Sequence, residues 1–170
     1  LEKPFAICRN LTQDWEKEAC AWEMAKQTVV LADFDTSLMF DAQIKAGRTW
    51  DDGAYLPGII KSAAFLIGED VETQDSELGQ KCSSIASDDL RQECVKGIAL
   101  GLVFNAEPEN EVTRPIAFCT WDGHSNAEKK ACAETVITQV VENYGEPARE
   151  QVCEQLLYQL PLVSTSCNEA

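Results

Sequence analysis

The stretch Cys82-Ser-Ser-Ile-Ala-Ser-Asp-Asp-Leu-Arg-Gln-Glu-Cys94 predicts two helices joined by a short turn. Apolar residues before the turn, ending with Ile85, are spaced three and four positions apart, which places them on one helical face. Ser87 and the two aspartates after it are a helix-start signal, because the serine oxygen can accept from a free backbone N–H. Apolar residues then recur every four positions as far as Leu102. The two cysteines lie on either side of the turn, so they can join antiparallel helices.

The same arrangement recurs along the chain. Ser125 lies seven residues before Cys132, as Ser87 lies seven before Cys94, and Glu128 completes a capping box with Ser125. The first cysteines of successive units, Cys82, Cys119 and Cys153, are separated by about 34–37 residues, the repeat length of helical solenoids. Two helices per unit and this period predict a short α-solenoid. An ordinary helical bundle with coincidental spacings is the alternative.

We therefore expect a single all-α domain over residues 1–170, built from disulfide-stapled helical hairpins. The expected hairpin units are residues 1–32, 36–70, 76–105, 111–144 and 147–170. The second unit has no cysteines, and Pro57 and Gly58 are poor early-helix residues, so it follows only from the apolar pattern. Gly145 and Pro147 mark the end of one helix and the start of the next.

Eight cysteines, an even number, indicate an oxidising compartment. The repeat selects one pairing of the cysteines. In the chain-entropy model, each of these disulfides stabilises the folded protein by about 3 kcal/mol. We expect no metal and no cofactor, because the chain has one histidine and no C-x-x-C spacing. The expected disulfides are Cys8–Cys20, Cys82–Cys94, Cys119–Cys132 and Cys153–Cys167.

The composition limits the partners. A net charge of −15 with 14 basic residues argues against nucleic acid and anionic lipid surfaces, both of which require clustered Lys and Arg. The apolar content of 45% excludes general disorder, and no apolar run approaches the length of a membrane span. We expect a secreted or periplasmic protein whose leader was removed before Leu1.

One short segment suggests an enzyme. Asp33-Phe34-Asp35-Thr36-Ser37 follows the apolar run Val29–Leu31 and resembles the first motif of haloacid-dehalogenase-type phosphatases. The resemblance implies a nucleophilic Asp33, a general acid/base Asp35 and a bound Mg²⁺ at the end of a buried strand. The repeat register instead places Val29–Leu31 at the end of a helix. We therefore expect the two aspartates in a solvated turn.

Two other polar residues are candidates for a role at the surface. His124 is the only histidine, and the cysteines that could act as its nucleophile are expected in disulfides, so we predict a surface turn histidine. Asn10-Leu11-Thr12 is a glycosylation sequon in a turn, which matters only if the source is eukaryotic.

With its Cys82/Cys94 and Cys119/Cys132 pairs followed by Gly97 and a small Ala99, the chain resembles secreted cysteine-rich helical repeat proteins of the tetratricopeptide superfamily. The resemblance implies a stack of helical hairpins, each with its own disulfide. It assigns no functional residues.

Solenoids present one curved surface, so the sequence predicts a non-enzymatic binding protein for a protein, peptide or glycan partner. Trp15, Trp50 and Trp121 lie in or beside expected turns and are candidate anchors, although packing can also explain them. The alternative is a carrier that holds a small apolar ligand in a central cavity.

Overall fold

The computed structural model describes residues 7–8, 10–33, 35–48, 53–69, 75–106 and 112–168, and within them the regular structure is helical. The predicted all-α fold is confirmed for this part of the chain. Its helices are α1 (Asp14–Leu31), α2 (Thr36–Arg48), α3 (Leu56–Gly68), α4 (Asp75–Ser83), α5 (Asp88–Phe104), α6 (Thr113–Thr120), α7 (Asn126–Tyr144), α8 (Glu146–Gln159), the 3-10 helix η3 (Pro161–Val163) and α9 (Ser164–Asn168).

The helix starts follow the capping residues that the sequence identified. The backbone N–H of Leu90 donates to Ser87 Oγ, and α5 begins directly after this serine. At the start of α7, Ser125 Oγ accepts from the Glu128 N–H, and the Glu128 carboxylate accepts from the Ser125 N–H at 2.7 Å. Gly145, with a φ of +83°, ends α7 and allows α8 to begin at once.

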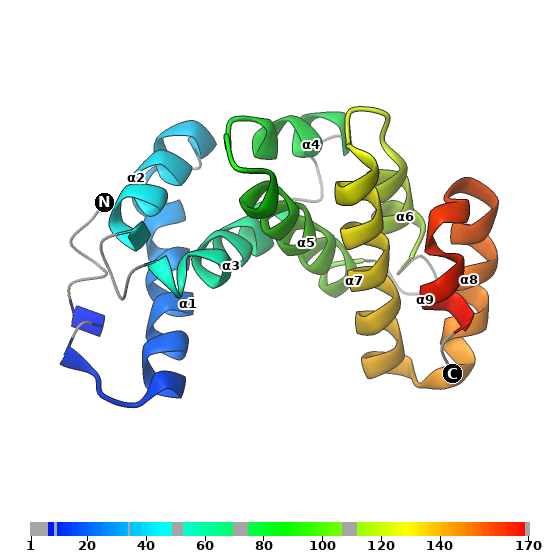
Figure 1. The fold of residues 1–170 in the computed structure, drawn as a ribbon, viewed down its shortest axis with the longest axis horizontal. Helices are drawn as coiled ribbons and strands as arrows, with labels where there is room; N and C mark the ends of the chain where they lie inside the picture. The colour runs from blue at the N-terminus through cyan, green and yellow to red at the C-terminus, as the bar shows by residue number, and fades with distance from the viewer. Residues whose placement is uncertain are drawn as a thin grey trace.

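The helices form an arch (Figure 1). Helices α1, α3, α5 and α7 pack one against the next and make the inner layer. The outer layer consists of α2, α4 and α6, each of which packs against inner-layer helices. Helix α8 packs on α7 at one end of the arch, together with η3 and α9.

Most helix pairs correspond to the expected hairpin units. Helices α2 and α3 fall within residues 36–70, α6 and α7 within 111–144, and α4 starts one residue before the third unit. The first unit differs, because residues 7, 8 and 10 are 3-10 rather than α-helical and residues 1–6 lie outside the described residues. The part of the last unit that follows α8 contains two short helices, η3 and α9.

All four predicted disulfides are present, and the chain has no free cysteine. Three of them join the two helices of one hairpin, α4 to α5, α6 to α7 and α8 to α9. The fourth, Cys8–Cys20, fastens the N-terminal segment to α1. Each bridge is therefore local, and none joins one hairpin to the next.

Helices α3 and α5 approach backbone to backbone. A Cβ atom on Gly97 would lie 2.2 Å from the carbonyl oxygen of Lys61, and one on Gly101 would lie 2.3 Å from that of Phe65. Gly68, at the end of α3, meets the Ile98 carbonyl in the same way, at 2.3 Å. Real Cβ atoms do not approach carbonyl oxygens this closely, so a side chain at any of these positions would force the helices apart.

No helix among the described residues is both long and apolar enough to cross a bilayer. The hydrophobic core consists mainly of small and branched aliphatic side chains together with the disulfides. Its largest fully buried side chains are Phe40 and Phe118.

The α3–α5 contact predicts a position-specific effect of alanine. Gly97→Ala and Gly101→Ala should each lower the free energy of unfolding by about 1–3 kcal/mol, because the new methyl group overpacks the contact. Gly58→Ala is the matched control, since a Cβ there meets nothing within 4 Å. It should be neutral or stabilise the protein by up to about 1 kcal/mol through helix propensity. Urea denaturation of the three variants tests this, and equal effects at positions 58 and 97 would contradict it.

Removing one hairpin disulfide should weaken the fold without changing its helix content. The double variant Cys82→Ala/Cys94→Ala should lose about 3 kcal/mol of unfolding free energy, because the unfolded chain regains the freedom of that loop. Chemical denaturation followed by circular dichroism measures the loss. Peptide mapping of the unreduced parent protein is the companion measurement, and bridges between different hairpins would contradict the pairing.

Candidate functional site

Helices α3, α5 and α7 of the inner layer each have a stripe of side chains that solvent reaches at least in part. On α3, Lys61 and Phe65 are half-buried and lie one turn apart. The α7 stripe, from Lys130 to Glu142, is polar and recurs every four residues. On α5, the exposed stripe consists of Lys96, Leu100 and Phe104. We call these three stripes together the inner face.

The inner face is hollowed between α5 and α7. A groove of about 350 Å³ is lined by Lys61 from α3, by Lys96 and Leu100 from α5, and by the α7 side chains Glu134, Thr135, Thr138, Gln139 and Glu142, together with Ala131. Leu100 is the one large apolar side chain among these residues. The groove therefore has mainly polar walls with a single apolar contact site.

An aromatic row lies across the inner layer next to this groove. The ring of Trp22 on α1 lies 6.3 Å from that of Phe65 on α3, and Phe65 lies 5.7 Å edge-on from Phe104 on α5, centroid to centroid. Phe104 is 56% exposed although it is a large aromatic residue. Its neighbour one turn back, Leu100, lines the groove, so the row and the groove are continuous.

A second cleft, of about 300 Å³, lies where the turn between α6 and α7 meets α4 and α5. The indole of Trp121 lies between two glycines there. A Cβ on Gly79 of α4 would lie 2.2 Å from Trp121 Cε3, and one on Gly123 would lie 2.2 Å from Cη2. The two glycines thus provide the space that the ring occupies, and Trp121 is half-buried rather than projecting into solvent.

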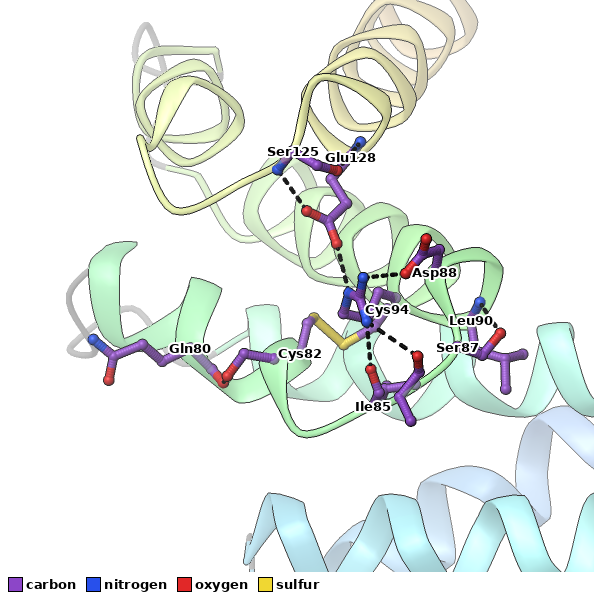
Figure 2. A network of polar contacts seen from close by, with 12 residues as sticks. Gln80, Cys82, Ile85, Ser87, Asp88, Leu90, Cys94, Ser125 and Glu128 are labelled. Carbon is purple, nitrogen blue, oxygen red and sulfur yellow. Dashed lines mark hydrogen bonds and ion pairs between the residues drawn. A yellow bond between two sulfur atoms is a disulfide. The ribbon is translucent and has the colours of Figure 1, made fainter.

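Arg91 and Glu128 connect two hairpins at this cleft. Arg91 Nε donates to Glu128 Oε1 at 2.9 Å, and the guanidinium also donates to the carbonyls of Ile85 and Ala86 and to the carboxylate of Asp88. Figure 2 shows Asp88, the Ile85 carbonyl and Glu128 converging on this group beside the Cys82–Cys94 disulfide. Burial alone would raise the pKa of Glu128, but hydrogen bonds from Ser125 and Arg91 outweigh it and lower the pKa. We call this contact the Arg91–Glu128 clasp.

The prediction of a surface position for His124 is wrong. The side chain is 6% exposed, and its ring packs edge-on against Phe118 at 4.9 Å and Trp121 at 5.0 Å between centroids. Its Nε2 atom is buried and has no hydrogen-bond partner within the described residues. Burial lowers the pKa of His124 to about 4, while Glu128 raises it and Lys129 lowers it to a lesser extent. The imidazole is therefore neutral near pH 7.

The polar groups of this second cleft mainly satisfy one another. Both carboxylate oxygens of Glu128 accept hydrogen bonds, and the Arg91 guanidinium has four acceptors. Ser125 Oγ caps α7, and Ser83 Oγ donates to the Gln80 carbonyl. Over the described ranges, no group of three His, Cys, Asp or Glu side chains is placed to hold a metal ion. The cluster is suited to holding two hairpins in register.

The three candidate tryptophans are not brought together. Trp15 lies in the first turn of α1 and is 68% exposed, whereas Trp121 packs in the second cleft. Trp50 lies outside the described residues. Asn10 of the sequon is exposed, as a modified residue would have to be.

The structure does not provide the buried strand that the phosphatase-like motif implies. The residues Val29–Leu31 are the end of α1, where the motif requires a buried strand. Asp33 and Asp35 are exposed in the turn between α1 and α2, as the repeat register predicted. Asp33 has a φ of +49°, and Asp35 Oδ1 accepts the Leu38 N–H at 3.0 Å at the start of α2. Both aspartates therefore shape the turn.

The residues of the inner face were not predicted from the sequence. Trp22, Phe65 and Phe104 are 39–43 residues apart along the chain, and only the packing of α1, α3 and α5 aligns them. Lys96, Leu100 and Phe104 do lie at intervals of four, so the exposed side of α5 could have been recognised as partly apolar.

Comparison of the chain with known protein families, curated proteins and solved structures finds no match. The resemblance to secreted helical repeat proteins of the tetratricopeptide superfamily therefore stays a prediction from the sequence.

The burial of His124 predicts a pH-dependent stability that one substitution removes. Between about pH 6.5 and 4 the unfolded chain binds a proton at this imidazole and the folded chain does not, so stability falls as the pH falls. The loss should approach roughly 3 kcal/mol across that window. Urea denaturation at pH 7 and pH 4.5 should show a smaller change for His124→Phe than for the parent protein.

A direct control is available because the chain has one histidine. Proton NMR therefore gives a single imidazole titration curve. A midpoint near 6.5 in the folded protein would contradict the burial of His124.

Proposed function

We propose that the chain is an exported, non-enzymatic binding protein that holds a protein, peptide or glycan partner against the inner face. The observation that carries this proposal is the continuity of the groove with the aromatic row. Binding energy concentrates in a few aromatic and aliphatic anchors surrounded by polar contacts, and the inner face offers this combination.

The rigidity of the inner face supports a role in recognition. Its aromatic and aliphatic anchors lie on α3 and α5, and the close contact of these two helices fixes the spacing between Phe65 and Phe104. Side chains that are already ordered before binding lose less conformational entropy when the partner arrives. A large aromatic side chain such as Phe104, over half exposed, is also costly to leave in water unless a partner covers it.

The four disulfides support the exported location, because such bonds persist in oxidising compartments. The alternative, a carrier of a small apolar ligand, requires an enclosed apolar cavity. The clefts described above and a third one between α6, α7 and α8 have volumes of about 220–350 Å³, and polar side chains line much of each. The open groove favours a partner that lies across the surface.

Substitutions at the anchors should weaken binding and leave the fold intact. Leu100→Arg and Phe104→Ala should each weaken capture of a partner from the source's envelope or culture fraction at least about tenfold, as expected for central anchors. Tyr158→Ala on α8 is the matched control, because Tyr158 is 91% exposed and lies away from the inner face. Circular dichroism and thiol titration confirm folding. A partner captured equally by all variants would contradict the proposal.

A further inference from the structure

We infer that the occupant of the inner face is an extended polypeptide segment that crosses α3, α5 and α7 and carries an acidic and a basic side chain about five or six residues apart. This inference rests on the proposed function. It identifies the class of partner, and which charge of the partner lies over which helix, from the charges of the groove and from the order of the helices.

The groove has charges of opposite sign on its two sides. Within the described part of the chain, neither Lys61 on α3 nor Glu142 on α7 takes part in an ion pair or a hydrogen bond of its side chain. The other charges of the groove are compensated. Lys96 Nζ lies 2.7 Å from Glu93, and Glu134 accepts from Ser166 Oγ at 2.6 Å. Glu134 also lies 3.7 Å from Lys130.

Lys61 and Glu142 thus define what a partner must supply. A carboxylate of the partner would pair with Lys61, and an ammonium or guanidinium group would pair with Glu142. Both pairs would be shielded from solvent by the partner itself, which strengthens them relative to exposed ion pairs. An apolar side chain between them would contact Leu100 and Phe104 on α5.

The helix order sets the distance that a partner must cross between the two helices that carry these charges. Helix α5 lies between α3 and α7 (Figure 1). Packed helices are about 8–10 Å apart axis to axis, so the axes of α3 and α7 are separated by about 16–20 Å. Because α3 and α5 approach closely, we expect this separation to be near the lower end of the range. An extended chain advances about 3.3 Å per residue, so about five or six residues span this distance.

A polypeptide fits this arrangement better than a glycan. Neutral sugars would leave Lys61 and Glu142 without counter-charges under the bound chain, and uncompensated buried charges are costly. A peptide supplies both signs and an apolar group within one short segment. The carboxamide of Gln139 on the α7 wall offers a further hydrogen-bonding group to a peptide backbone.

Selection from a library of random 12-residue peptides displayed on phage, against the full disulfide-bonded chain, tests this inference. Enriched peptides should carry an acidic and a basic residue five or six positions apart with an aromatic or aliphatic residue between them. Synthetic copies of these peptides should bind the Lys61→Glu variant at least about tenfold more weakly than the parent protein. This corresponds to a loss of about 1.4 kcal/mol of binding free energy. The double variant Lys61→Glu/Glu142→Lys should prefer peptides in which the two charges are exchanged.

Matched charge reversals away from the inner face are the controls. Lys81→Glu on α4 and Glu154→Lys on α8 should leave the affinity within about twofold, since charges on helices outside the inner face are screened by solvent and salt. An effect of equal size at these positions would mean that net charge alone drives binding, and it would overturn the inference.

The remaining outcomes separate the inference from the proposed function. Peptides without the charge pattern that still require Leu100 and Phe104 would overturn the inference and leave the binding face standing. Peptides that bind Leu100→Arg as well as the parent would overturn the proposed function. A library that yields no enriched peptide would overturn the polypeptide class, and a glycan array would then test the other partner class.

Discussion

The architecture depends on the contact between the backbones of α3 and α5. Every disulfide lies within one structural unit, so the joints between units must come from packing. At this joint, Gly68, Gly97 and Gly101 let carbonyl groups of one helix touch the other helix directly. The contact holds the cysteine-free pair α2–α3 against the first hairpin of the disulfide-linked series. A helix pair without its own bridge can belong to the array because this neighbour holds it so closely.

The next joint along the chain uses charge instead of close backbone packing. Glu128 completes the capping box of α7 and also accepts a hydrogen bond from Arg91 on α5, so one carboxylate fixes both the helix start and the neighbouring hairpin. Trp121 fills the remaining space against Gly79 of α4. A half-buried ion pair contributes little net stability once desolvation is counted, but its geometry favours one register of the hairpins over others. The two joints therefore fix the spacing of the inner-layer helices by different physical means.

Local features were predictable from the sequence and long-range ones were not. The disulfide pairing, the caps at Ser87 and Ser125 and the helical end of α1 follow from residues close together in the chain. The inner face and the Arg91–Glu128 clasp depend on which helices meet, and a repeat period does not specify this. The error at His124 has a different reason, because the rings that pack against it are close to it in the chain. Its turn looks exposed locally, but Phe118 and Trp121 fold over it.

These constraints explain why recognition is best placed on the inner layer. The outer helices α4 and α6 are short and are joined to α5 and α7 by disulfides, so their packing already has a structural role. On the exposed stripes of α3 and α7, Lys61 and Glu142 make no side-chain hydrogen bond or ion pair within the described residues. Leu100 lines the groove, and Phe104, one turn further along α5, is 56% exposed beside it. We propose that a partner covers this surface, in which a polar-walled groove adjoins exposed aromatic side chains on packed helices.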